Sequence, residues 1–191
     1  MRLLERVDGE LVAIRAFALR DVPELTELRC RNRAFNEAFE ARRSEAFYSE
    51  SGQRAEVVRD LGEWAADRMY AFAIVELGAG EPIRGRVALA NIVRGAWHNA
   101  TVGYFVDEAS NGHGFATEAV ALALRFAFGS ARLHRVQAAV MPHNVRSATV
   151  LRRNGFRHEG HAPRYLRLDG AWRDHDIYAI TAEEIGTVTS G

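Results

Sequence analysis

The chain has 191 residues, of which 48% are hydrophobic. This length and composition suit one domain, expected over residues 1–191, with a core that needs no disulfide, and they exclude a disordered chain. The 25 basic and 25 acidic residues cancel, which argues against a general nucleic-acid binder and against a membrane-surface protein. All 25 basic residues are arginine, so no lysine can serve chemistry.

The predicted elements begin with a strand at residues 11–17 and a helix that starts at Asp21 and runs to Arg31. Residues 32–53 are polar and aromatic, and we expect a helix or a loop that covers a substrate as a lid. A second helix is predicted at residues 54–68 from its apolar spacing. The side chains expected to face inward from it are Val57, Leu61, Trp64 and Ala65.

Three strands then follow, and the turns between them indicate antiparallel pairing. They are predicted at residues 70–76, 83–93 and 100–106. From residue 114 onward, helix and strand alternate, which is typical of a βαβ arrangement. The elements predicted there are a helix at 114–128, a strand at 135–140 and a helix at 144–154.

The last predicted strands lie at residues 156–161, 165–168 and 174–180, with a turn at Asp169-Gly170. The sheet is therefore expected to be mixed, antiparallel first and βαβ-like afterwards, and the fold class is mixed α/β. Residues 1–17 lack the apolar region of a signal peptide, and Arg125 interrupts the most apolar stretch. Since Cys30 is the one cysteine, we expect a cytoplasmic protein without a membrane partner.

A strand runs into a glycine-bearing helix start at residues 111–118. Free backbone N–H groups at a helix N-terminus bind phosphate, and glycines let the ligand approach the backbone closely. Nine arginines and two acidic residues lie between Ser110 and Leu168, a local charge that would attract a cofactor with several phosphates. The alternative is that Gly112 and Gly114 form only a turn, beside a solvated arginine-rich face.

The segment after residue 140 predicts a capped helix. Asn144 stands where a strand becomes a helix and suits the N-cap, while Gly155 suits the end of the helix. Ser147, three residues after the cap, should project toward the same end of the sheet as the glycine loop. Its hydroxyl could donate a proton to a leaving thiolate, although a serine in a first helical turn is also an ordinary structural choice.

These two segments, in this order, resemble the two acyl-CoA motifs of the GNAT N-acetyltransferase superfamily. The superfamily loop usually reads Gln or Arg, two residues, Gly, one residue, then Gly or Ala. Here the positions are Asn111, Gly114 and Ala116, so the first one departs. Further segments resemble the ribosomal-protein-alanine N-acetyltransferases of RimJ type, and the likeness runs from about Gly85 to Ile180. These segments are residues 91–96, 141–144, 146–147 and 169–175.

The resemblance implies a GNAT-type fold, a largely antiparallel mixed sheet flanked by helices, with acetyl-CoA as donor. It implies as acceptor the N-terminal α-amine of a protein, such as a ribosomal protein, attacking directly in a ternary complex. Backbone N–H groups would polarise the acetyl carbonyl where residues 104–106 splay from their neighbour. The residues implied for cofactor binding are Phe105, Val106, Asn111, Gly112, His113, Gly114, Phe115, Ala116, Thr117, Asn144 and Ser147.

The catalytic residues implied by the resemblance are Ser147 and Tyr104. Many relatives place an acidic tyrosine seven residues after the motif asparagine, but that position here is Leu151, so Ser147 is the candidate acid. The base stays open between a water and the side chains of Tyr104, Asp174 and His175. An α-amine has a reference pKa of roughly 8, against about 10.4 for lysine, and needs only a weak base.

Two other functions stay open at this point. One keeps acetyl-CoA but takes a small amine as acceptor, such as an amino acid, a polyamine or a drug, and acidic groups lining the groove would favour it. The other is a non-catalytic acyl-CoA-binding module that assists ribosome assembly. The seven histidines lack a compact ligand spacing, so no metal is predicted. His158 and His161 are expected on opposite faces of a strand.

Overall fold

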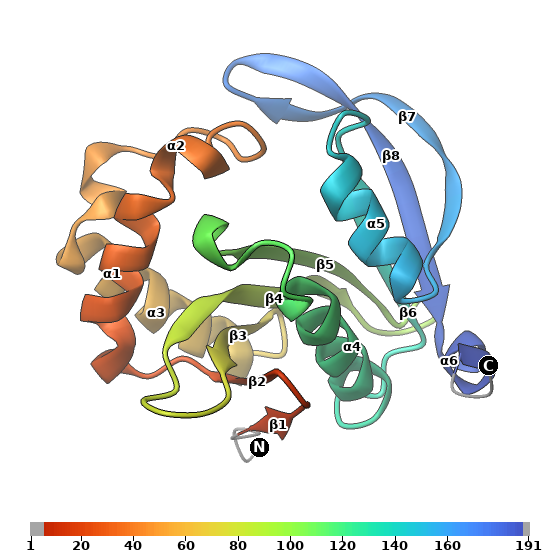
Figure 1. Cartoon of the computed structure of the whole chain (residues 1–191). Coiled ribbons are helices and arrows are strands. Elements are labelled where there is room, and N and C mark those ends of the chain that lie inside the picture. The colour runs from red at the N-terminus through yellow and green to blue at the C-terminus, as the bar shows by residue number, and fades with distance from the viewer. Residues whose placement is uncertain (1–5, 189–191) are drawn as a thin grey trace.

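The computed structural model describes residues 6–188, and this range forms an eight-stranded mixed sheet with helices on both faces (Figure 1). The strand order is β1-β2-β3-β4-β5-β6-β8-β7. The strands are β1 (Val7–Asp8), β2 (Val12–Ala16), β3 (Tyr70–Glu76), β4 (Ile83–Val93), β5 (Asn99–Val106), β6 (Arg135–Val140), β7 (Arg157–Leu168) and β8 (Ala171–Thr181). The α-helices are α1 (Val22–Arg31), α2 (Arg33–Asn36), α3 (Glu50–Ala65), α4 (Phe115–Phe128), α5 (Val145–Arg153) and α6 (Ala182–Val188).

The predicted mixed α/β class is confirmed. Within residues 6–188 the strand pairs are antiparallel except for β5 and β6, which run parallel and are connected through α4. Three short 3₁₀ helices, Leu19–Asp21, Glu45–Tyr48 and Glu108–Ser110, fill connections in this range. No helix in the described part of the chain is both long and apolar enough to cross a membrane.

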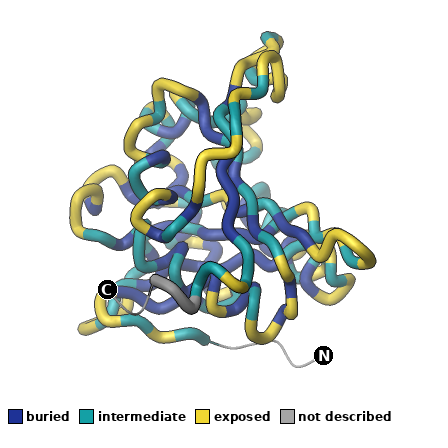
Figure 2. The backbone as a smooth tube through the Cα atoms, turned by 90° about the vertical axis from the view of Figure 1, so that its right-hand side faces the viewer, coloured by how far each residue is buried: buried dark blue, intermediate teal, exposed yellow. Residues whose placement is uncertain are grey.

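Alternation along the central strands builds a core on each face of the sheet. In β3, Tyr70, Phe72 and Ile74 pack in the cluster that contains α4, whereas Ala71 and Ala73 pack against α1 and α3. Figure 2 shows these central strands as the buried middle of the molecule. Because both faces are covered, the strands read as nearly continuous apolar runs.

The helix α3 differs from its prediction at its start, at its end, which is Ala65 rather than residue 68, and at its buried face. It begins at Glu50 rather than at residue 54, because the Ser49 side chain caps it by accepting a hydrogen bond from the Gly52 N–H at 3.1 Å. Ala65 is exposed, which corrects its expected inward position. The residues of α3 that are buried are Gln53, Val57, Asp60 and Trp64.

The last two strands form a hairpin whose exposed tip projects at the top of Figure 2. The turn at Asp169-Gly170 is confirmed, with φ of 49° and 81°. β7 is one strand with irregular register, not two. The expectation for His158 and His161 was wrong: a register shift at Gly160 brings both rings beside Asp176, at 3.7 and 2.9 Å.

A buried carboxylate joins the end of α1 to the end of β5. Asp107 is 3% exposed, and its Oδ2 accepts hydrogen bonds from Arg31 Nε and Nη2 at 3.1 and 2.7 Å. Its Oδ1 accepts one from Asn32 Nδ2 at 3.0 Å, while Asn32 Oδ1 accepts from the Glu108 N–H at 2.7 Å. Burial alone would raise the pKa of Asp107, but the bonds from Arg31 and Asn32 outweigh it and lower that pKa.

Replacing Asp107 with asparagine is expected to reduce the free energy of unfolding by about 2 kcal/mol at pH 7, the order expected when a charge-assisted bond is lost. Since the pKa of Asp107 is lowered by folding, its contribution is present above the ordinary carboxyl pKa of about 4 and lost as pH falls through the lower folded value. The difference between Asp107→Asn and wild type, measured by urea unfolding, should therefore shrink below about pH 4. A constant difference down to about pH 3 would contradict this explanation. Glu108→Gln, at the exposed neighbouring position, is the control.

Candidate active site

A gap between β5 and β6 forms the centre of the site. The two strands pair at Asn99–Arg135, Ala100–Val136 and Thr101–Gln137. Beyond Thr101, β5 continues beside β4 and β6 continues beside β8, so the two strands diverge. The backbone groups that would complete the parallel ladder are therefore available to a ligand. A cavity of 520 Å³ opens at this gap, between the α1–α2 side and α5.

The cavity brings together some of the predicted site residues. Those that line it are Tyr104, Phe105, Val106, Asn111, Ala116, Asn144 and Ser147. Five others lie in the turn and first residues of α4 without lining this cavity, and they are Gly112, His113, Gly114, Phe115 and Thr117. Of these, Phe115 is packed in the core at 9% exposure, and the Thr117 carbonyl accepts a hydrogen bond from Asn154 Nδ2 at 3.1 Å.

Two predicted catalytic side chains meet at the gap. Asn144 caps α5, its Oδ1 accepting from the Ser147 N–H at 3.1 Å. The Tyr104 hydroxyl lies 2.9 Å from Ser147 Oγ and 3.1 Å from the Ser147 carbonyl oxygen. Burial raises the pKa of Tyr104 to about 12, although the bond with Ser147 opposes the shift. The phenol is therefore neutral at ordinary pH and can donate a hydrogen bond.

The start of α4 has the geometry of an anion site. Gly112 and Gly114 both have φ of 85°, a left-handed conformation that glycine adopts without strain. Gly114 is the N-cap and brings no side chain, so the first N–H groups of α4 have no cap acceptor. The Glu118 carboxylate is engaged elsewhere, accepting from the N–H groups of residues 10–12. This loop has the geometry to bind a phosphate group.

The candidate bases occupy different environments. His175 is 3% exposed and lines the cavity. Its Nδ1 lies 3.0 Å from the Arg173 carbonyl, which only accepts, so Nδ1 carries the hydrogen and Nε2 is left as an acceptor. Asp174 lies outside this cavity and accepts from the Arg164 N–H at 2.7 Å.

Two other expectations concern residues outside the candidate bases. Leu151 is fully buried in the core. Among the described residues no group of three or more His, Cys, Asp or Glu is arranged to hold a metal ion.

Arginines line the cavity from elements that the charge pattern had not indicated. Of the nine arginines between Ser110 and Leu168, Arg146 alone lines the cavity in the described part of the chain. The other three arginines that line it, Arg29, Arg43 and Arg86, come from earlier in the sequence. Among the described residues, Glu40 is the one that brings a carboxylate to the lining of this cavity. A signal for Arg29 was present in the sequence, because it stands on the apolar stripe of α1 with Leu25 and Leu28.

The fold and the site define an acyltransferase class. Residues 12–157 match the family model described as acetyltransferase (GNAT) domain, and the chain belongs to this family and is an acetyltransferase. It is also RimJ-like. It is 32% identical to the Escherichia coli (strain K12) [Ribosomal protein uS5]-alanine N-acetyltransferase, over 94% of this chain and 92% of that protein.

Two further relatives agree with this placement. The probable N-acetyltransferase YjcK of Bacillus subtilis (strain 168) is 37% identical over 90% of this chain and 94% of its own length. The solved structure of Mycobacterium smegmatis RimJ in complex with CoA-disulfide superimposes with a TM-score of 0.86 at 34% identity, covering 91% of this chain and 83% of that chain. The predicted family and fold are thereby confirmed.

Proposed function

We propose that the chain transfers an acetyl group from acetyl-CoA to the N-terminal α-amine of a protein, such as a ribosomal protein, by direct attack in a ternary complex. The observation that carries this proposal is the Tyr104–Ser147 pair, 2.9 Å apart, at the gap between β5 and β6 in a cavity of 520 Å³. The named activity of the Escherichia coli relative supports the choice of acceptor. The reducing cytoplasm suits the exposed free thiol of Cys30.

The donor side of the site is made by the start of α4 and by α5. In this proposal the N–H groups from Gly112 to Thr117 hold the diphosphate, with His113 and Phe115 in the same turn. Backbone groups of Phe105 and Val106, which lack a partner in β6, form hydrogen bonds with the pantetheine arm of the cofactor. Asn111, Ala116 and Asn144 border the same arm. Acetyl-CoA supplies the acetyl group and a thiolate leaving group.

The proton transfers use side chains that the fold has already positioned. The one hydrogen of the Tyr104 hydroxyl can be donated to the Ser147 carbonyl oxygen or to Ser147 Oγ. In this proposal Oγ accepts it during the reaction, which leaves the serine hydrogen for the leaving sulfur. The amine loses its proton on the other side of the reacting carbon. His175 Nε2 accepts it through a water, because Nδ1 is already committed to the Arg173 carbonyl. The backbone N–H groups at the gap stabilise the oxygen of the tetrahedral species.

The cavity charge favours an α-amine over a polyamine. Four arginines and one glutamate line it, so a substrate with several cationic groups would be repelled. Nearby guanidinium groups also disfavour the ammonium form of the acceptor, which lowers its pKa and increases the neutral, reactive fraction. A second groove beside the cavity is lined by four carboxylates within the described residues, and each already has a partner. Glu37 contacts Arg33, Glu40 contacts Arg29, Asp169 contacts Arg42 and Asp174 contacts His161.

The direct test is an acceptor panel. We expect peptides with a free N-terminal Ala or Ser to be acetylated on the α-amine, while N-blocked lysine peptides stay unmodified, as read by the mass of the products. Acetylation of small amines alone would contradict the proposal and favour the small-molecule alternative. Acetyl-CoA binding without any product would favour the acyl-CoA-binding module.

A further inference from the structure

Arg29 is a buried cation that lines the cavity, and its guanidinium N–H groups donate no hydrogen bond to the described residues. Its side chain is 11% exposed and its Nη1 lies 3.5 Å from Glu40 Oε2, without a hydrogen bond to any described residue. The guanidinium stacks 3.7 Å from the centroid of the Phe105 ring. The Nε atom is fully buried and has no partner among the described residues. A guanidinium has five N–H donors, so Arg29 can donate hydrogen bonds to an acceptor group of a ligand.

One carboxylate, that of Glu40 at 3.5 Å, faces Arg29, and it makes no hydrogen bond with the guanidinium. Burial lowers the pKa of Arg29 to about 10, Glu40 raises it, and the charges of Arg86 and Arg43 lower it again. The side chain is nevertheless protonated at neutral pH. A buried charge without a hydrogen-bonded partner is costly, and an arriving anion would remove that cost. The unusual burial of this cation thus indicates a ligand of negative charge.

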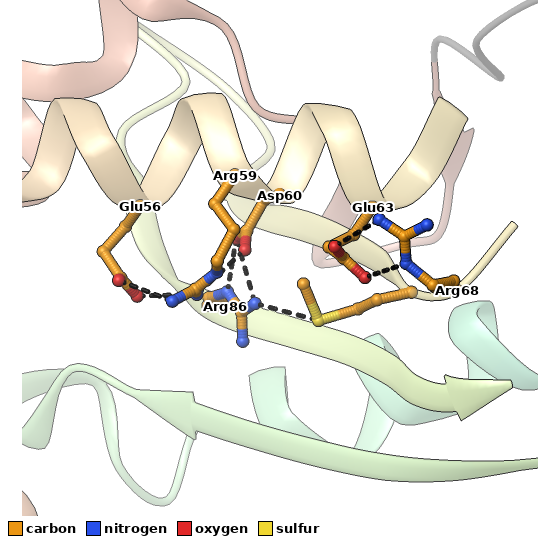
Figure 3. Close-up of polar contacts among 7 residues, drawn as sticks. Glu56, Arg59, Asp60, Glu63, Arg68 and Arg86 are labelled. Atoms are coloured by element: carbon orange, nitrogen blue, oxygen red, sulfur yellow. Dashed lines mark hydrogen bonds and ion pairs between the residues drawn. The ribbon is translucent and has the colours of Figure 1, made fainter. Parts of the chain in front are cut away.

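Arg86 adds a second, oriented cation to the same part of the cavity. It extends from β4 to Asp60 on α3, with Nε and Nη2 at 3.2 and 3.0 Å from Asp60 Oδ2 (Figure 3). Its Nη1 makes no hydrogen bond within the described chain. Arg43, which follows α2, also lines the cavity, with its guanidinium 5.1 Å from the Phe47 ring centroid. We call the region lined by Arg29, Arg43 and Arg86 the Arg29 pocket.

The Arg29 pocket lies across β5 from the proposed donor side. Tyr104 and Phe105 are consecutive in β5, so their side chains leave opposite faces of the strand. Tyr104 contacts Ser147 of α5, whereas Phe105 packs with α1 and carries Arg29 on its ring. One cavity includes both sides through the gap. A group bound at Arg29 therefore belongs to the acceptor rather than to the donor.

Resting on the proposed function, we propose that the Arg29 pocket binds a carboxylate of the acceptor, and that the acceptor is an N-terminal peptide with Asp or Glu close behind its reactive amine. A planar guanidinium pairs with a carboxylate through two parallel hydrogen bonds. The residues of the peptide, at roughly 3.3–3.6 Å each when extended, can carry the acidic side chain across β5. A free amino acid offers the same chemistry through its α-carboxylate, and the test separates the two sources.

The test measures binding without turnover. Product peptides of sequence acetyl-Ala-Glu-Ala and acetyl-Ala-Ala-Glu, with amidated ends, are titrated into the protein in the presence of CoA, beside their glutamine counterparts and acetylglutamate. The better glutamate peptide is expected to bind roughly 10- to 100-fold more tightly than its counterpart, as when a charge-assisted bond is gained. In Arg29→Gln this preference should disappear. Arg68→Gln, which loses an exposed ion pair with Glu63 outside the cavity (Figure 3), should retain it.

Each outcome decides the proposal. Equal binding of glutamate and glutamine peptides to wild type, or a preference that survives in Arg29→Gln, would overturn it. Tight binding of acetylglutamate but of neither peptide would overturn the peptide class. Arg43→Gln, at an exposed position, should weaken the preference without endangering the fold. If the glutamate peptide binds through Arg29 but its unblocked form is not acetylated, the carboxylate site stands and the proposed function fails.

Discussion

Ser147→Ala is expected to lower kcat for peptide acetylation by about 100-fold or more, the usual contribution of a positioned general acid. The hydroxyl of Ser147 is held by the Tyr104 hydroxyl at 2.9 Å, and its backbone N–H is held by the Asn144 cap. Alanine keeps the N–H and the cap but removes the proton for the leaving thiolate. Affinity for acetyl-CoA, measured by titration, should change little. Single-turnover kinetics would then place the loss in the chemical step.

The matched control for this variant is Thr149→Ala on the same helix. Thr149 is half-buried and lies outside the cavity, and its Oγ1 bonds only to the Val145 carbonyl and Arg152 within the described residues, so its loss should leave kcat unchanged. Tyr104→Phe should cost less than Ser147→Ala, because in the proposal the phenol orients the serine, whereas the serine gives up the proton. Wild-type turnover by Ser147→Ala would rule out this serine as the acid.

Phe126→Ala should be among the most destabilising single changes of an aromatic side chain, lowering the free energy of unfolding by about 4 kcal/mol. Phe126 on α4 meets Trp64 of α3 and Tyr70 and Phe72 of β3, with ring centroids 5.7, 4.9 and 5.0 Å away. Truncation leaves a cavity and removes three aromatic contacts at once. Urea unfolding checks the value, and the melting temperature should fall by roughly 10 °C.

Phe128→Ala provides the comparison for Phe126→Ala. Phe128 ends the same helix and is only partly buried, so its truncation should cost about 1 to 2 kcal/mol, as for ordinary substitutions. Equal losses for the two variants would contradict the stabilising role assigned to the buried ring cluster. The glutamine and alanine variants of the active site are expected to stay within this milder range.

The sequence predicted the central sheet better than its margins. β3, β4 and β6 have their predicted limits because apolar runs bounded by turns specify buried strands. β1 has two residues and was not predicted, because its antiparallel partner β2, not its own pattern, defines it. α6 was also missed. It follows β8 without a loop, and Glu184 accepts from the Thr181 N–H at its start.

In the site, local motifs were readable and distant partners were not. The cap at Asn144 and the helix start near Gly114 depend on neighbours in sequence, so residue types alone placed them. Arg29 and Arg86 meet at the cavity only through folding of α1 against the sheet. The net charge of zero for the whole chain gives no sign of this local cluster of arginines. Polar residues on the apolar face of a helix, such as Arg29 on α1 or Asp60 on α3, were the signal that sequence reasoning overlooked.

The divergence of β5 and β6 also has a mechanical consequence. Three residue pairs join the strands on one side of the gap to those on the other. Apart from the two pairs that hold the short edge strand β1 to β2, this is the weakest pairing in the sheet, and it lies along the line where the substrates would lie. A donor bound in the gap would act as a substitute strand and bridge the two halves. Hydrogen exchange of the amides near this line should then slow with ligand concentration, since binding raises the free energy of local opening. The substrate would be a structural component of the sheet for as long as it is bound.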